Sequence, residues 1–442
     1  MSTPDRLTAK LEQLLAADQR EKRLPAIAAA VLRDGEPVWE SAMGAADVEA
    51  GIEATPDTQF RCGSITKTFT AAAIMQLRDA GKLDLEDTLD VHVEGAAHKP
   101  SIRRLLSHAS GLQRETQDDS WLTLRFAPPD ELLATLESAE MVLPSGARFH
   151  YSNLAYALLG IVVERVSGLR YTDYVRERLF EPLGLSRLSF EPEPPAAKGY
   201  VGQPYADRVW NAIDVETGAW ASAGQLWGTV GDLCRWGAFL ADPDESVLAT
   251  KSAEEMRTVQ VIADHERWTA GYGLGLALRR DGERILAGHS GSMPGFIAML
   301  FFSPADKVVT AALTNESHGL IGELALALVR TTVEEWPVAP EAWGVGEPPP
   351  DDVLPLLGTW FIEATQVDLR WRDGKLEARS PSDAAWEPPA IFERESDDRW
   401  RTVAGPERGE ALRIERAPDG SVTRMIWAGY PVTREPGPWH AP

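Results

Sequence analysis

Ser64 and Lys67 are the residues whose types and spacing could do chemistry, because they set a hydroxyl nucleophile one helical turn from an amine. The alanines and the apolar side chains at one-turn spacing that follow Ser64 predict a helix, which Gly81 ends. Ser64 then lies at the N-terminal end of this helix, where the helix dipole favours developing negative charge. The pair therefore predicts a serine nucleophile beside a candidate base.

Two further motifs follow along the chain. Tyr151 and Asn153 stand where an extended segment meets a strongly apolar helix predicted over residues 154–166. Ser152 or Asn153 can cap that helix, since both side chains accept hydrogen bonds from free helix N–H groups. A predicted strand carries His289. A serine followed three residues later by a lysine is common by chance. The Ser64 and Lys67 pair, the Tyr151 and Asn153 pair and the strand with His289, in this order, together form a much more specific pattern.

No other chemistry in the sequence competes with these motifs. The eight histidines lack metal-ligand spacing and no phosphate-binding glycine motif occurs, so we predict no metal and no cofactor. Residues 288–292 resemble the nucleophile turn of another hydrolase fold but lack its final glycine. His108, at a predicted helix end, is interpreted as bonding backbone groups, and Cys62 as a small buried residue.

The composition excludes several classes of partner. The chain of 442 residues has a formal net charge of −23, so nucleic acid and anionic membrane surfaces would repel it. It has no apolar run of about 18 residues and no secretion signal at its start, so we predict a cytoplasmic globular protein. The two cysteines, Cys62 and Cys234, are predicted to be free thiols.

The order of predicted elements indicates an α+β domain over residues 1–336. A hairpin that turns at Asp34 and Gly35 opens the chain. The strands predicted to share its sheet cover residues 26–32, 37–40, 271–278, 284–289, 296–302 and 308–314. A helical insertion separates the first two from the rest, and a helix near 320–336 should cover one face. Residues 337–355 read as a proline-rich linker, and the short strands of residues 356–442 predict a small all-β barrel.

Over roughly residues 7–336 the motifs resemble the serine acyl-enzyme family of penicillin-binding proteins and class C β-lactamases. Residues 181–185, 272–275 and 288–291 look like further landmarks of that family. The resemblance implies an antiparallel sheet flanked by helices, with a helical subdomain, and it identifies the C-terminal module as a lipocalin-like barrel. Cytosolic esterases, D-aminopeptidases and peptide-cyclising enzymes are relatives within this family.

The resemblance also implies a role for each catalytic residue. Ser64 attacks an acyl carbonyl and forms a covalent ester, while neutral Lys67 or the phenolate of Tyr151 takes its proton. Either group would need a lowered pKa. Asn153 would orient Lys67 and bond a substrate amide. His289 would place Tyr151 or bond the substrate.

Backbone groups complete the implied site. The N–H groups of Ser64 and Ser292 are the predicted oxyanion hole, and Gly291 would let an acyl chain lie against the strand. His289 stands where many relatives carry lysine, which weakens the fixed positive charge that penicillin-like carboxylates meet. β-Lactamase or cell-wall transpeptidase activity is therefore not the favoured interpretation.

The favoured interpretation is a stand-alone thioesterase that releases and cyclises a nonribosomal peptide head to tail, with a D-residue in the substrate. Its substrate would be a peptide or acyl thioester, free or presented on a carrier protein. In such enzymes an arginine near the end of the barrel, here Arg434, would meet the peptide carboxylate, and a solvated surface arginine is the alternative. A D-aminopeptidase or esterase of the same family is the second hypothesis, and a non-catalytic binding protein on this fold is the third.

Overall fold

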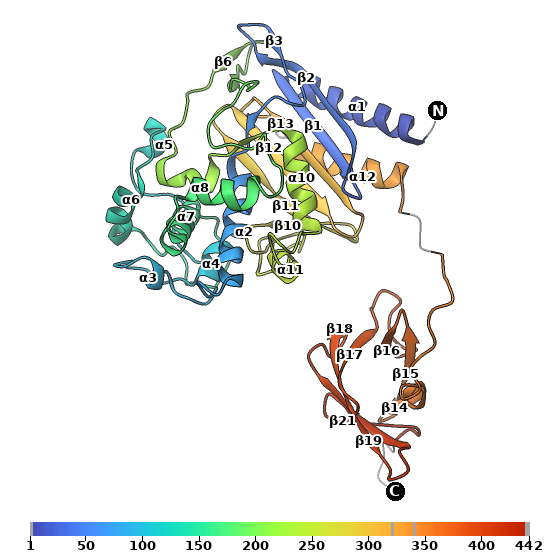
Figure 1. Ribbon diagram of the computed structural model, residues 1–442. Coiled ribbons are helices and arrows are strands. Elements are labelled where there is room, and N and C mark those ends of the chain that lie inside the picture. Colours follow the sequence, from blue (N-terminus) through green and yellow to red (C-terminus); the bar gives the residue numbers. More distant parts are fainter. Residues whose placement is uncertain (1–2, 320–321, 339–341, 438–442) are drawn as a thin grey trace. The chain divides into compact units, whose positions relative to one another are not determined.

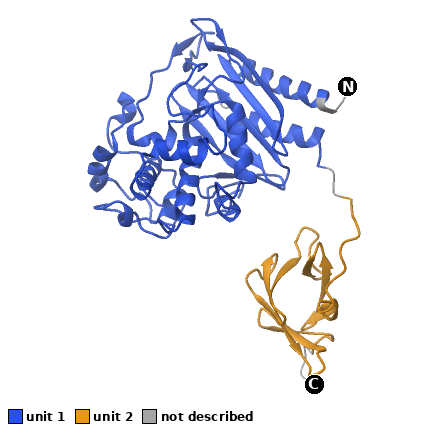
Figure 2. Ribbon diagram, viewed as in Figure 1, with its two compact units in different colours: residues 1–338 blue, residues 339–442 orange. Residues whose placement is uncertain are grey.

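The computed structural model describes residues 3–319, 322–338 and 342–437. The chain forms two compact units, residues 1–338 and residues 339–442 (Figure 2). The first unit carries every predicted catalytic residue, and the second is the all-β module with Arg434. Each unit has its own hydrophobic core.

A nine-stranded antiparallel sheet forms the centre of the first unit, with the strand order β3-β2-β1-β13-β12-β11-β10-β9-β8. Its strands are β1 (Ala26–Arg33), β2 (Glu36–Asp47), β3 (Ile52–Glu53), β8 (Val261–Ile262), β9 (Ala270–Tyr272), β10 (Ala277–Asp281), β11 (Arg284–Met293), β12 (Phe296–Ser303) and β13 (Val308–Thr314). Both ends of the unit's sequence contribute strands, which confirms the predicted sheet with its helical insertion. The β1–β2 turn has left-handed residues at Asp34 (φ +51°) and Gly35 (φ +79°), as a tight hairpin requires.

The prediction of one continuous strand over residues 271–278 is wrong, because the structure has two strands there, β9 and β10. Gly273 donates a backbone hydrogen bond to Leu276 O at 2.8 Å, and Gly275 has φ +78°. The chain therefore turns between β9 and β10, which pair with each other.

Helices cover both faces of the sheet (Figure 1). Helices α1 (Thr3–Glu21) and α12 (Gly322–Glu335) pack on one face, where they bury the side chains of Ile27, Ala29 and Val31 of β1. Helix α10 (Val230–Ala241) packs on the other face, over Ala28 and Ala30. Strand β1 is buried along its whole length because it serves both cores. The final helix predicted near residues 320–336 is α12, and residues 320–321 of that prediction lie outside the described part of the chain.

The helical subdomain surrounds α2 (Thr66–Asp79) and α7 (Asn153–Ser167). Ser152 caps α7, with its hydroxyl accepting from Ala155 N at 3.0 Å, and Phe69 of α2 stacks on Trp236 of α10 at 3.9 Å. The shorter helices are α3 (Leu89–His92), α4 (Ile102–Leu106), α5 (Ser120–Thr123), α6 (Pro129–Thr135), α8 (Tyr171–Val175), α9 (Ala221–Gly224) and α11 (Thr250–Met256). Two small sheets complete the unit, pairing β4 (Phe60–Arg61) with β7 (Trp227–Gly228) and β5 (Tyr200–Gly202) with β6 (Val209–Asn211).

The second unit is a closed barrel of eight consecutive strands, which confirms the predicted all-β module. The strands are β14 (Gly358–Ile362), β15 (Thr365–Arg372), β16 (Lys375–Arg379), β17 (Ala390–Ser396), β18 (Arg399–Ala404), β19 (Ala411–Arg416), β20 (Val422–Trp427) and β21 (Tyr430–Thr433). Pairing of β14 with β21 closes the barrel, so no strand edge is left open. Trp360, Phe392 and Met425 are buried inside it.

Across the described residues, no helix combines the length and the apolar character needed to cross a bilayer. The cytoplasmic location inferred from the sequence stays a prediction.

Candidate active site

Ser64 and Lys67 meet at the start of α2. Ser64 belongs to the single turn η1 (Gly63–Ile65) that leads into this helix, and the Lys67 side chain is completely buried. Lys67 Nζ lies 3.0 Å from Ser64 Oγ, 2.8 Å from Asn153 Oδ1 and 2.7 Å from Ala223 O. The last two oxygens can only accept, so they fix two N–H groups of the amine. In a neutral amine the remaining lone pair then faces the Ser64 hydroxyl.

Burial decides the charge of Lys67. The loss of solvent lowers the pKa of the amine well below its usual range, and the Glu115 carboxylate opposes this effect while Arg114 adds to it. The amine therefore has a share of its neutral form at neutral pH that an exposed lysine lacks. That form can take a proton from Ser64.

Tyr151 is half-buried and lies beside both Ser64 and Lys67. Burial raises the pKa of its phenol above the ordinary value, and the Ser64 hydroxyl and Arg114 counter this only in part. The Arg114 guanidinium lies 4.8 Å from the centre of the Tyr151 ring, and Lys67 Nζ lies 5.1 Å from it. The expectation that Tyr151 has a lowered pKa is wrong for the free protein, because desolvation outweighs the nearby cation. Tyr151 is thus a neutral phenol beside a buried amine.

Asn153 connects Lys67 to a carboxylate that sequence reasoning missed. While Asn153 Oδ1 accepts from Lys67, its Nδ2 donates to Glu115 Oε1, and the other oxygen of Glu115 accepts from Trp220 Nε1 at 3.3 Å. Because a carboxylate only accepts, Glu115 fixes which end of the Asn153 amide faces Lys67. Glu115 belongs to no motif, and only the fold brings it to Asn153 across 38 positions of sequence.

His289 lies on β11, and its side chain is buried. Its Nε2 lies 2.8 Å from the hydroxyl of Tyr272, and its Nδ1 lies 2.5 Å from Ser290 O. Burial lowers the pKa of His289 to about 3, so the imidazole is neutral. The ring centres of His289 and Tyr151 are 6.2 Å apart. The side chain of His289 thus contacts Tyr272, and its predicted roles, placing Tyr151 or bonding the substrate, stay predictions.

The segments around Ser64 and Ser292 touch through their backbones. A Cβ placed on Gly63 would lie 2.6 Å from Ser292 N, and one on Gly291 would lie 1.8 Å from Cys62 O and 3.1 Å from Ser64 N. Gly63 also has φ +51°. Only glycine permits this approach at both positions, and it brings together the two N–H groups predicted to form the oxyanion hole.

A narrow cleft of about 40 Å³ opens beside Ser64. Its walls hold an aromatic cluster in which Phe126 contacts Trp121 at 5.1 Å and Trp220 at 5.2 Å between ring centres. The lining residues are Ser64, Trp121, Phe126, Asn153, Thr217, Trp220, Ala223, Gly224, Ser292 and Met293. Aromatic walls of this kind favour contact with an apolar group. No motif marked the aromatic residues in the sequence.

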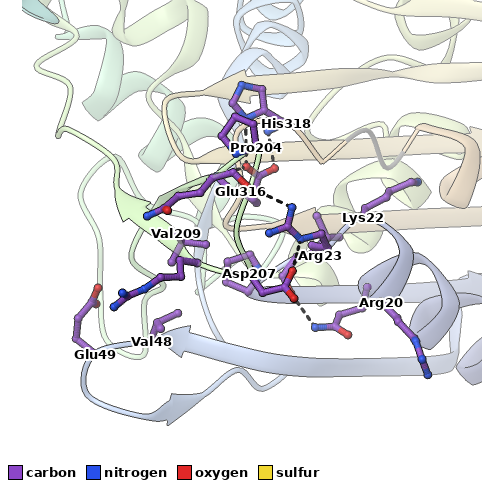
Figure 3. Close-up of a pocket in the computed structure, with 16 residues that line it drawn as sticks. Arg20, Lys22, Arg23, Val48, Glu49, Pro204, Asp207, Val209, Glu316 and His318 are labelled. Carbon is purple, nitrogen blue, oxygen red and sulfur yellow. Dashed lines mark hydrogen bonds and ion pairs between the residues drawn. The ribbon is translucent and has the colours of Figure 1, made fainter.

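A wider hollow of about 870 Å³ lies elsewhere on this unit (Figure 3). It lies between the end of α1 and the β5–β6 hairpin and shares no lining residue with the cleft. Among its lining residues, Arg23 Nε lies 2.9 Å from Asp207, and His318 Nδ1 lies 3.3 Å from Glu316. No residue of the predicted motifs lines this hollow, so Ser64 and Lys67 remain the candidate centre.

Four other residues named from the sequence lie outside this group: His108, the two cysteines and Arg434. His108 Nδ1 accepts from Ser152 N at 3.1 Å, which confirms its predicted bonding to backbone. Both cysteines are buried free thiols, as predicted. Arg434, in the barrel unit, lies 3.7 Å from the centre of the Trp360 ring and donates to the carbonyls of Pro355, Leu357 and Thr359. These contacts hold the barrel together, and binding of a peptide carboxylate by Arg434 stays a prediction.

The sequence matches the Beta-lactamase family over residues 11–331, and the chain belongs to that family. Residues 349–434 match a second family, described as Domain of unknown function (DUF7586). Penicillin-binding protein 4 of Amycolatopsis lactamdurans is 31% identical over 393 residues, which cover 80% of this chain and 98% of that protein. The predicted family and its fold are thereby confirmed.

Solved structures add further relatives. A structure of SurE with D-Leu matches at a TM-score of 0.61 and 26% identity, covering 98% of this chain and 99% of that one. The D-stereospecific amidohydrolase from Streptomyces sp. matches at a TM-score of 0.61 and 25% identity, covering 74% of this chain and 99% of that one. The chain is thus a member of a β-lactamase-like serine hydrolase family that includes penicillin-binding proteins and amidohydrolases.

Proposed function

We propose that this protein is an acyl-transfer enzyme in which Ser64 forms a covalent ester with its substrate. The observation that carries the proposal is the buried Lys67 amine, 3.0 Å from Ser64 Oγ and held by two oxygens that can only accept. Its lowered pKa supports Lys67 rather than Tyr151 as the base of acylation.

The proton movements follow from this arrangement. Lys67 takes the Ser64 proton as Oγ attacks the acyl carbonyl, and the N–H groups of Ser64 and Ser292 receive the oxyanion. The neutral Tyr151 phenol then gives its proton to the leaving group as the carbonyl re-forms. Lys67, now an ammonium, stabilises the resulting phenolate. In deacylation the phenolate takes a proton from the incoming nucleophile, and Lys67 returns its proton to Ser64.

For the acyl group we propose a thioester of an apolar D-configured residue at the end of a peptide, free or presented on a carrier protein. The aromatic walls of the cleft support an apolar side chain. A D-residue is supported by two relatives whose names carry it, SurE with D-Leu and the D-stereospecific amidohydrolase. Neutral His289 provides no fixed positive charge for a penicillin-like carboxylate.

For the acceptor we favour the peptide's own amine, which gives a head-to-tail macrocycle. The chain has a barrel unit in addition to its catalytic unit, as expected from the resemblance to peptide-cyclising members of the family. The apolar cleft walls disfavour water as the competing nucleophile. Hydrolysis by a D-aminopeptidase or esterase is the second candidate. The likeness to the D-stereospecific amidohydrolase, which covers 74% of this chain, favours it.

Intact-protein mass spectrometry after exposure to a peptidyl thioester or a fluorophosphonate tests the acyl-enzyme. We expect one adduct, carried by Ser64 and absent from the Ser64→Ala variant. A protein that gains no adduct from either reagent would instead be a non-catalytic binding protein on this fold. The acceptor is tested with a thioester whose last residue is D-leucine. A product one water lighter than the linear acid supports cyclisation, and linear acid alone supports hydrolysis.

A further inference from the structure

The barrel unit has a hollow of about 280 Å³ at one end. Its lining residues come from the connections β14–β15, β16–β17, β18–β19 and β20–β21, which all lie at that end because the strands run alternately up and down. An eight-stranded barrel is wide enough to be filled by side chains or to hold one small ligand. Here buried side chains fill the rest of the interior, and this mouth stays open.

The floor of the hollow is apolar and contains an anchored aromatic ring. It is formed by Ile362, Val367, Ala378, Ala390 and Trp427. Trp427 donates its indole N–H to Thr402 Oγ1 at 3.0 Å and packs edge-on against Phe392, so its position is fixed. Tyr430, which is 54% exposed, adds a second ring at the rim. Such walls suit the apolar body of a small molecule.

The rim of the hollow is acidic. Asp383, Glu387 and Glu407 line it together with a single cation, Arg379, whose guanidinium donates to Ala384 O at 3.1 Å. Neither Glu387 nor Glu407 has an ion-pair partner within the described ranges 3–319, 322–338 and 342–437. Carboxylates above aromatic rings form a favourable environment for an organic cation, through ion pairing and cation–π contact.

We propose that the mouth of the barrel binds a small organic cation with an apolar body, such as a primary amine on an aromatic or branched aliphatic group. The volume is below that of typical sites for drug-sized ligands, which are about 300 Å³ or larger, so the ligand has roughly the size of one amino-acid derivative. This site belongs to the barrel unit, whereas Ser64 belongs to the first unit, and the proposal does not depend on the chemistry proposed at Ser64.

Isothermal titration calorimetry on the full chain tests the site with phenethylamine, and with phenylacetate as a probe of opposite charge. We expect saturable binding of the amine and none of the acid. The double variant Glu387→Gln/Glu407→Gln keeps the side-chain shapes and should weaken amine binding about tenfold, since two partly exposed ion pairs are lost. Glu393→Gln, an exposed carboxylate outside the hollow, is the matched control and should change binding less than twofold.

Two further measurements locate the amine. The Ser64→Ala variant should bind phenethylamine as the natural chain does, because the site lies in the barrel. Tyr430→Ala should weaken binding several-fold without changing turnover of a thioester. Equal binding of phenylacetate, an unchanged affinity in the double variant at an unchanged melting temperature, or no heat at millimolar phenethylamine would each overturn the proposal.

Discussion

Glu115 gives the sharpest test of how the site is held together. It accepts from Asn153 Nδ2, and Asn153 Oδ1 accepts from Lys67 Nζ at 2.8 Å, so the carboxylate orients the amine through one amide. In Glu115→Ala that amide loses its fixed partner and can turn. A hydrogen bond to a charged group is worth about 1.5–3 kcal/mol, which corresponds to a loss of about 10- to 150-fold in the acylation rate.

Glu115→Gln separates orientation from charge. Its amide oxygen can still accept from Asn153, so only the weaker bond from Trp220 at 3.3 Å loses its acceptor. Its rate at high pH should therefore fall less than fivefold, a typical cost of about 1 kcal/mol or less. The negative charge that raises the pKa of Lys67 is gone, however, so that pKa falls further. Because the base acts in its neutral form, the acid limb of the pH–rate profile should move to lower pH.

The assay is single-turnover acylation of Ser64 by a peptidyl thioester, followed from about pH 5 to pH 10 in each variant. Glu131→Ala, which removes an exposed carboxylate of α6, is the matched control and should leave the profile unchanged. An unchanged rate in Glu115→Ala would refute the orienting role. An acid limb of Glu115→Gln that stays in place or moves to higher pH would refute the assignment of Lys67 as the base.

Three further predictions follow from the same geometry. In the Tyr151→Phe variant, Ser64 should be acylated at the normal rate by an aryl ester, whose leaving group needs no proton, but at least about 100-fold more slowly by an amide. Equal losses of the acylation rate with both substrates in stopped-flow assays would contradict the role of Tyr151 as the acid. His289 is neutral in the fold with a pKa near 3 but takes a proton near pH 6.5 when unfolded, so its contribution is present above pH 6.5 and is lost as the pH falls toward 3. Urea titrations from pH 7 to pH 4 should therefore show a smaller loss of unfolding free energy in His289→Asn than in the natural chain, and equal losses would contradict this. Gly291→Ala places a methyl group 1.8 Å from Cys62 O, so it should lower stability by about 1–3 kcal/mol and remove Ser64 adducts; an unaffected melting temperature would show that the two segments are not in contact.

Local patterns were enough to predict the scaffold. The Asp34-Gly35 turn, the alternating strands and the apolar helix after Ser152 are properties of short segments, and each formed where its own residues favour it. The exception is instructive: residues 271–278 alternate like one strand, yet Gly273 and Gly275 turn the chain. Glycine in an alternating stretch fits both a strand and a turn, so the pattern could not decide between them.

The partners of the candidate site were harder to predict. Glu115 and Trp220 reach Asn153 and the cleft only through the fold, and neither has a spacing that marks it. The sign of the pKa shift at Tyr151 was also out of reach, because it depends on how much solvent the folded chain removes from the phenol. A sequence shows which ionisable groups are present, but their burial in the fold decides their pKa values and therefore which of them are charged.

Burial also explains how one environment can produce both a base and an acid. Removing water disfavours the charged form of any group, so it lowers the pKa of the Lys67 ammonium and raises that of the Tyr151 phenol. Two groups with ordinary pKa values near 10 are thereby separated in opposite directions and are both neutral in the same pH range. The neutral amine can only gain a proton from Ser64, and the neutral phenol can only give one to the leaving group. In the proposed mechanism, desolvation therefore favours this direction of proton transfer without a fixed charge from His289.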